Sequence, residues 1–383
     1  MGGTGRRSRL LLSAACCLAG LALGSCQDPS LADKSIWAVV NSWEPVGSPA
    51  ISPATVMNTS IAVAPDGTPC VAFMDGAIAA YASVMKFNGA GWTYLGSPGF
   101  SDVTAGSETL AFDSSGVPYV AFTAGTPPGV SVMNYTAAGW NYVGGANISG
   151  STGVGVLQVS IAVDPAGVPY VAYADSSTTK TAVLKYSGTA WTPVGPAGGF
   201  SIAGAGNVSL AIDKSGTPYV AFRDAGGGIN VSVFDGSNWQ VLGTPDFSAS
   251  TVWSVSLAID AAGTPYVAFS DTSTGTNYAS VMKFKGGAWS YVGQQYLSAG
   301  SVDYVSLALT PAGNPVVAYG DGSTSGPATV MQLSGGSWVP MGRTGFSGGA
   351  AYYVSLAIDS NGTPYVVYED ALHGGHATVM RYR

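Results

Sequence analysis

The residues best suited to chemistry are few, because only 9% of the 383 residues are charged. One acidic set recurs at intervals of about 49 residues, with Ala124 at the corresponding place of one interval: Asp75, Asp175, Asp224, Asp271, Asp321 and Asp370. A ring of carboxylates could bind a cation such as Ca²⁺, or the hydroxyl groups of a sugar. The regular copying favours another role, in which each carboxylate accepts backbone N–H groups of its own loop. The cation stays an open alternative.

Four aromatic residues have the opposite property, because they are not copied at every interval. They are Trp253, Tyr304, Tyr352 and Tyr353. Aromatic rings near a surface stack on sugar rings or pack against apolar partner residues. We take these four as candidate ligand-binding residues, with ordinary partial burial as the alternative.

The segments between these residues form a repeat. Copies of residues 209–222, SLAIDKSGTPYVAF, begin at Ser60, Thr109, Ser160, Ser209, Ser256, Ser306 and Ser355. Each copy alternates large and small side chains, passes through a turn with Gly and Pro, and alternates again, which predicts two antiparallel strands. A third strand follows, and then a fourth that opens on a tryptophan.

Four short strands per repeat without any helical stretch predict an all-β fold, a seven-bladed β-propeller with four antiparallel strands per blade. A sandwich or barrel need not repeat its sequence, and a β-helix has shorter repeats. The last repeat ends after its third strand, whereas residues 43–47, WEPVG, match the fourth. We therefore expect the N-terminal strand to complete the last blade and residues 36–383 to form one closed domain.

The repeat resembles that of the NHL propellers. Residues 210–224, LAIDKSGTPYVAFRD, have a similar apolar-Asp-Gly-Tyr-Val-Asp order, although the period is longer and the Arg-Ile segment expected after the last Asp is missing. Over residues 36–383 the chain resembles more closely the bacterial surface propellers whose repeats add a Gly-rich turn and Trp-x-x-Val-Gly. That group has no single assigned activity. The resemblance implies the fold and transfers no catalytic residue.

The N-terminus predicts export from the cytoplasm. Three arginines precede an apolar run over residues 10–23, and Gly24 and Ser25 lead into Cys26. This order is typical of a secretory signal peptide over residues 1–25. LGSC resembles the lipobox of bacterial lipoproteins, which implies a lipid on Cys26, a short tether over residues 26–35 and a place in the bacterial cell envelope. Cleavage of a plain signal peptide nearby is the alternative.

The net charge argues against a nucleic-acid partner, and the number of cysteines argues against a disulfide. Removing residues 1–25 leaves 11 basic against 21 acidic side chains and a net charge of −10, so a nucleic-acid partner is not expected. Cys70 is the one cysteine left without a predicted role, so no disulfide forms within the mature chain. We expect a monomer that uses no cofactor.

The strand order assigns the turns to two ends of the ring. Turns between the first and second strands and between the third and fourth are short and nearly identical, whereas the other turns and the crossings between blades vary. Variable loops on a rigid scaffold are where binding usually occurs. We therefore expect a binding or scaffold protein that recognises a glycan or a protein partner at this variable-loop face.

A secreted propeller enzyme, a glycoside hydrolase or lyase, is the alternative. Glycosidases use paired carboxylates, and sialidases, which are also propellers, add an arginine cluster and a Tyr-Glu pair. Beyond residue 25 the arginines and glutamates number seven: Arg223, Arg343, Arg381, Arg383, Glu44, Glu108 and Glu369. Two histidines, His373 and His376, fall short of the three or four ligands of a zinc site. This inventory favours binding over catalysis and predicts no metal site.

Overall fold

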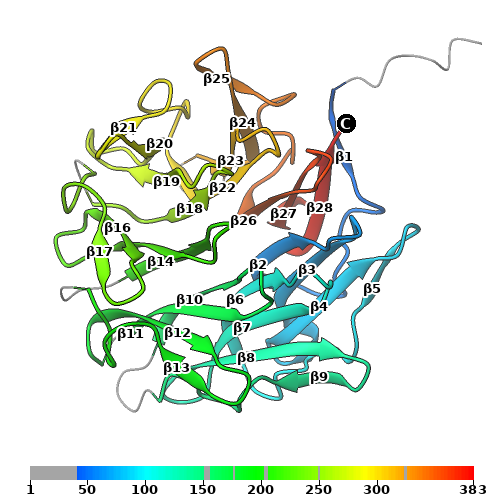
Figure 1. Ribbon diagram of the computed structural model, residues 1–383. Coiled ribbons are helices and arrows are strands. Elements are labelled where there is room, and N and C mark those ends of the chain that lie inside the picture. The colour runs from blue at the N-terminus through cyan, green and yellow to red at the C-terminus, as the bar shows by residue number, and fades with distance from the viewer. Residues whose placement is uncertain (1–40, 151–155, 176, 202–205, 249–250, 323–325) are drawn as a thin grey trace, which may run out of the picture. The chain divides into compact units, whose positions relative to one another are not determined.

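The computed structural model describes residues 41–150, 156–175, 177–201, 206–248, 251–322 and 326–383. Asn41–Arg383 form a compact unit of seven four-stranded antiparallel sheets arranged in a ring (Figure 1). The prediction of an all-β, seven-bladed propeller is confirmed. Two short 3₁₀ helices, η1 (Gly76–Ile78) and η2 (Ala371–His373), interrupt the loops. The predicted signal peptide, Cys26 and the tether lie outside the described residues.

The innermost strand of each blade is the first alternating segment of the repeat. These strands are β2 (Val56–Val63), β6 (Ala105–Phe112), β10 (Val156–Val163), β14 (Gly206–Ile212), β18 (Val255–Ile259), β22 (Val302–Leu309) and β26 (Ala351–Ile358). Each lies beside the next around the ring, and β26 lies beside β2. They therefore surround a central channel. We number the blades 1 to 7 by these strands.

The second strands open on a proline and are mostly buried. They are β3 (Pro69–Asp75), β7 (Pro118–Ala124), β11 (Pro169–Asp175), β15 (Pro218–Arg223), β19 (Pro265–Asp271), β23 (Pro315–Asp321) and β27 (Pro364–Asp370). The turn before β15 shows why the repeat keeps its residues. The Asp213 carboxylate accepts the N–H groups of Ser215 at 2.8 Å and Thr217 at 2.9 Å, and Gly216 has φ +86°. Only glycine adopts that φ at little cost.

The third and fourth strands form the outer half of each blade. The third strands are β4 (Tyr81–Phe87), β8 (Gly129–Thr136), β12 (Lys180–Tyr186), β16 (Ile229–Phe234), β20 (Tyr278–Lys285), β24 (Ala328–Ser334) and β28 (His376–Tyr382). The fourth are β5 (Trp92–Tyr94), β9 (Gly139–Tyr142), β13 (Trp191–Pro193), β17 (Trp239–Val241), β21 (Ala288–Tyr291), β25 (Ser337–Pro340) and β1 (Trp43–Pro45).

Blade 7 is completed by the N-terminal strand, as predicted. Its sheet has the order β1-β28-β27-β26, and β1 pairs antiparallel with β28. The carboxylate of Glu44 on β1 pairs with Arg381 Nε at 2.7 Å and with Arg383 Nε at 2.8 Å. The two ends of the described chain thus close the ring.

The repeated Trp-x-x-Val-Gly motif links each blade to the one before it. All seven motif tryptophans donate their indole N–H to a carbonyl of the preceding blade, as Trp239 does to Val194 at 2.7 Å. The glycine beside that carbonyl lies against the ring. At Gly195, a Cβ atom would come within 2.8 Å of Trp239 Cδ1. The motif therefore forms a contact between neighbouring blades at the outer rim of the ring.

The repeated serine makes the matching contact near the channel. In six seams its Oγ accepts a backbone N–H of the next blade, as Ser306 does from Leu356 at 3.0 Å. Blade 2 carries Thr109 at this position, and its buried hydroxyl has no partner. The seam between blades 2 and 3 lacks the hydrogen bond that the repeat provides elsewhere.

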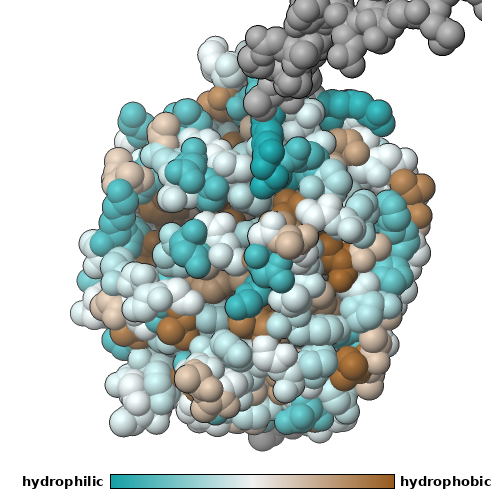
Figure 2. Space-filling view, turned by 90° about the vertical axis from the view of Figure 1, so that its right-hand side faces the viewer, coloured by the Kyte–Doolittle hydropathy of each residue, from teal (hydrophilic) through white to brown (hydrophobic). Residues whose placement is uncertain are grey.

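Apolar side chains fill the seams between neighbouring blades. In each crossing, an apolar residue a few positions after the motif tryptophan packs into the seam with the next blade. Phe100 is an example, since its ring stacks on that of Trp140 with centroids 4.1 Å apart. On the face in Figure 2, apolar residues lie in recesses and at scattered spots rather than in one continuous patch. In the described part of the chain, no helix has the length and hydropathy needed to cross a membrane.

Candidate functional site

The inner strands begin at the variable-loop face with an irregular backbone. In six blades the pairing with the second strand shifts at this point, as a β-bulge does. Five non-glycine residues there have φ between 49° and 55°: Asn58, Ser107, Asn207, Tyr304 and Tyr353. This conformation is uncommon for any residue with a Cβ, and a bulge re-aims the side chain it carries. All five residues line the channel or its mouth.

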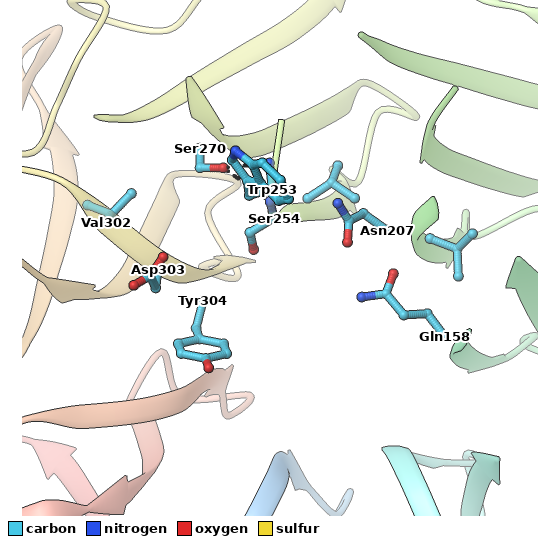
Figure 3. A pocket seen from close by; sticks show the side chains of 10 residues that line it. Gln158, Asn207, Trp253, Ser254, Ser270, Val302, Asp303 and Tyr304 are labelled. Carbon is cyan, nitrogen blue, oxygen red and sulfur yellow. Dashed lines mark hydrogen bonds between the residues drawn. The ribbon is translucent and has the colours of Figure 1, made fainter. Parts of the chain in front are cut away.

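A pocket of about 340 Å³ opens where blades 3 to 6 meet at the channel mouth. We call it the mouth pocket, and it is lined by Gln158, Asn207, Val208, Trp253, Ser254, Val255, Ser270, Val302, Asp303 and Tyr304. Figure 3 shows Gln158 and Asn207 on one side and Asp303 and Tyr304 on the other, with Trp253 and Ser254 between them. The indole of Trp253 is 61% exposed, which is unusual for so large an apolar side chain.

Hydrogen bonds hold the crossing that carries Trp253. Ser270 Oγ on β19 accepts the N–H groups of Trp253 at 2.9 Å and Ser254 at 3.1 Å. Ser254 Oγ in turn accepts the N–H of Val305 in blade 6 at 3.1 Å. The guanidinium of Arg223 lies 5.6 Å from the centre of the indole ring, a cation–π contact. The backbone that carries the exposed ring is therefore held by hydrogen bonds, and the ring itself contacts Arg223.

Two polar groups of the mouth pocket have no partner in the described part of the chain. Gln158 Oε1 is buried without a hydrogen bond. Asp303, the second residue of β22, has neither a hydrogen bond nor an ion pair, and burial raises the pKa of its carboxyl. Unsatisfied polar groups in a concave site are costly in the free protein and available to a ligand.

A second cavity, of about 250 Å³, continues down the channel and shares Ser254, Val255 and Tyr304 with the mouth pocket. We call it the channel cavity. The rings of Tyr304 and Tyr353 meet on its wall with centroids 4.9 Å apart. Burial, together with the neighbouring Tyr353, raises the pKa of Tyr304 to about 12. Both hydroxyls stay protonated at neutral pH, so they can donate and accept hydrogen bonds but are poor general bases.

The channel cavity also contains Glu108 of β6, a residue that sequence reasoning did not single out as a site residue. Its side chain is 3% exposed, and neither carboxyl oxygen has a hydrogen-bond partner. Burial raises the pKa of this carboxyl to about 8, and the nearby Asn58 amide offsets only part of the effect. Five other blades carry valine at this position: Val159, Val208, Val255, Val305 and Val354. The sequence could have marked Glu108 as a candidate site residue, because it is acidic at a repeat position that is valine in five other blades.

The structure brings together three of the four aromatic candidates. Trp253 and Tyr304 line the mouth pocket, and Tyr353 lines the channel cavity beside Tyr304. Tyr352 pairs with Glu369 on β27 and lines neither cavity. The predicted aromatic cluster is therefore smaller, and it is joined by polar residues that were not predicted.

The repeated aspartates cap their own loops. Asp75, Asp175, Asp224, Asp271 and Asp370 each accept a backbone N–H two residues further on, at 2.8 to 3.1 Å. Asp271 also accepts from the side chains of Ser273 and Gln295. The predicted turn-holding contact is confirmed for these five. The loop of Asp321 includes residues 323–325, which lie outside the described residues.

The remaining candidates for catalysis or metal binding do not converge. His373 Nδ1 lies 2.7 Å from Asp370 Oδ2, whereas His376 Nδ1 lies 2.6 Å from the carbonyl of Ser52. Among the residues described, no three or more His, Cys, Asp or Glu side chains form a group suited to a metal ion. Arg381 and Arg383 are bound to Glu44 in blade 7 and do not form an arginine cluster around the channel.

Comparison with known proteins places the chain by its fold. No family model and no curated protein matches it. Among solved structures, a PL25 ulvan lyase bound to -[GlcA(1-4)Rha3S]- aligns with a TM-score of 0.59 at 11% identity, over 87% of this chain and 94% of that one. The SapL1 lectin in complex with alpha methyl fucoside aligns with a TM-score of 0.51 at 15% identity, over 79% and 99%. A protein of unknown function from Dyadobacter fermentans DSM 18053 aligns with a TM-score of 0.52 at 15% identity, over 89% and 99%. At these identities the likeness concerns the fold alone.

Proposed function

We propose that this chain is a glycan-binding propeller whose ligand occupies the mouth pocket. The observation that carries the proposal is the exposed ring of Trp253 beside Gln158 Oε1 and the Asp303 carboxyl, which have no hydrogen-bond partner in the described residues. A flat aromatic surface next to a few free polar groups suits a sugar ring, which presents an apolar face and hydroxyl edges. Two of the structural neighbours were solved with sugars bound, which supports the same ligand class.

Replacing Trp253 with alanine should weaken binding of the preferred glycan at least tenfold without lowering the melting temperature, because a ring that is 61% exposed contributes little to the core. A glycan array with residues 27–383 identifies the ligand, and calorimetry then measures the affinity of each variant. Asp271→Ala is the matched control. It removes a buried cap and should lower the melting temperature while leaving the affinity unchanged. If only the aspartate variant lost binding, Asp271 would be the ligand-binding residue and Trp253 would not.

The second candidate function is glycoside hydrolysis or lysis. One observation favours it, since burial raises the pKa values of two carboxyls, Asp303 and Glu108, that line the connected cavities. Raised carboxyl pKa values are typical of general acids. Incubating the purified protein with its array ligands separates the two functions, because new reducing ends or unsaturated uronate products would establish catalysis. We expect neither, since the phenols on the channel wall are protonated and no arginine lines either cavity.

We further propose that the propeller is held at the bacterial cell envelope by a lipid on Cys26. The signal sequence and the LGSC motif support this location. The Cys26→Ser variant should move from the membrane fraction to the soluble fraction, because no other segment beyond residue 26 is apolar enough to hold it. Immunoblots of the two fractions measure the change. A serine variant that still sediments with membranes would overturn the anchor.

A further inference from the structure

The mouth pocket and the channel cavity carry acidic groups without any basic group. The charged residues that line them are Asp303 and Glu108, and no lysine, arginine or histidine is among the lining residues. In the described part of the chain neither carboxyl forms an ion pair, and the Asn58 amide is the polar side chain that acts on Glu108. A third carboxyl, Glu369, acts electrostatically on Tyr304 and Tyr353 from β27. At neutral pH the negative charge of the connected space therefore comes from Asp303, with Glu369 nearby, because Glu108, whose pKa is about 8, mostly holds its proton.

Arg223 is the basic residue beside this space, and its guanidinium contacts protein groups. The Arg223 guanidinium covers the Trp253 ring and donates to the carbonyl of Val252 at 3.4 Å. Arg223 itself lines neither cavity. An acidic ligand, such as a uronate, a sulfated sugar or a sialate, would thus bring its charge toward Asp303, and the charged guanidinium of Arg223 contacts the Trp253 ring without lining either cavity. Placing like charges together costs affinity and disfavours such ligands.

The free polar atoms specify the complementary ligand. Gln158 Oε1 and the Asp303 carboxylate are acceptors, so they require donors on the ligand. An ammonium group supplies three donors and a positive charge, and it is also attracted to the faces of aromatic rings such as Tyr304. We infer that the mouth pocket and channel cavity select glycans with a free amino group, such as glucosamine oligomers, over N-acetylated or acidic glycans. The inference rests on the proposed glycan-binding function and names its ligand class.

A metal ion fits the same charges less well. Ca²⁺ takes six to eight oxygen ligands, usually from several carboxylates. In the described residues, no cluster of three or more His, Cys, Asp or Glu side chains exists at this space or elsewhere. An organic cation needs fewer ligands, and the aromatic wall would contact its sugar ring.

The test compares three trisaccharides by calorimetry at pH 6, where an amine is protonated. The probes are trimers of glucosamine, N-acetylglucosamine and galacturonate. We expect the glucosamine trimer to bind about tenfold or more tightly than its N-acetylated counterpart, the range of one hydrogen-bonded charge pair. Asp303→Asn should remove this preference, because it keeps the shape and loses the charge. Glu108→Gln should leave the preference unchanged, because Glu108 is already protonated at pH 6. Trp253→Ala should weaken the trimers that bind by a similar factor.

Several results would overturn the preference for amino glycans without bearing on the proposed glycan-binding function, which has its own test. Equal affinities for the glucosamine and N-acetylglucosamine trimers would show that charge plays no part, while loss of both in Trp253→Ala would still support glycan binding. Preference for galacturonate, or no binding of the glucosamine trimer, would also refute it. Calcium ions alone serve as the last probe. Binding of Ca²⁺ that disappears in Asp303→Asn would assign the carboxyl to a metal instead.

Discussion

Deleting residues 36–47 should abolish the cooperative unfolding of the propeller. These residues include β1, whose loss leaves β28 unpaired at its outer edge. The deletion also removes Trp43, which stacks on Phe346 at 4.5 Å and donates to Met341, and Val46, which is buried in the seam with blade 1. Trp43 is half-buried, and truncating a fully buried tryptophan typically costs about 3 to 5 kcal/mol. Losing Trp43 together with Val46 and the β1–β28 pairing therefore approaches the total stability of a domain.

The measurement is thermal unfolding followed by calorimetry and light scattering. The truncated chain should lose its sharp transition and aggregate, because an unpaired strand edge recruits other chains. Deleting residues 27–35 is the matched control, since it shortens the predicted tether and leaves β1 in place. The control should melt like the full mature chain. A truncation of 36–47 with an unchanged melting curve would show that blade 7 is stable with three strands.

The fold was predictable because the repeat copies its structural contacts. Asp213, Gly216 and the tryptophan of each blade have roles that follow from local geometry, and the structure repeats them around the ring. The closure followed from a strand missing at one end and present at the other. The serine contact was not predicted, because its partner is a backbone N–H in the next blade, about 50 residues away.

The site was less predictable because it lies where the copies differ. Gln158, Asn207 and Tyr304 are corresponding residues of three blades, each two positions before the repeat's first residue. Their side chains reach the channel because the bulge reorients the strand, and no residue pattern in the sequence marks that bulge. Exposed aromatics in the crossings were a partial guide. They led to Trp253 and Tyr304 but also to Tyr352, which lines neither cavity.

Glu108→Val should stabilise the protein, and the gain should grow with pH. Burial raises the pKa of Glu108 from 4.5 to about 8. No charged group contributes to this shift, and the polar neighbours are Asn58 and the residue's own backbone. Valine is the residue that five other blades place in this position, so the substituted side chain fits the seam. Removing an unsatisfied buried carboxyl should therefore help the fold even when it is protonated.

The sign of the pH dependence follows from the direction of the shift. The folded state holds the proton more tightly than the unfolded chain, so the acid costs no ionisation energy below pH 4.5. As pH rises from 4.5 to 8, the unfolded chain ionises first and stability falls. Above pH 8 the penalty is constant, at about 4 to 5 kcal/mol as an upper limit. The difference in unfolding free energy between Glu108→Val and the parent should therefore be small at pH 4 and largest near pH 8.

Glu108→Gln separates the cost of ionising the buried carboxyl from the cost of burying a polar group without a partner. Glutamine cannot ionise but still buries a polar group without a partner, so it should remove the pH dependence and recover less stability than valine. Urea unfolding of the three proteins at pH 4, 6 and 8 measures both effects. A constant difference between valine variant and parent across this range would mean that Glu108 ionises normally in the folded state. If the valine variant instead gains stability and loses its preference for the glucosamine trimer, the channel carboxyl destabilises the fold while serving the ligand, as strained functional groups do.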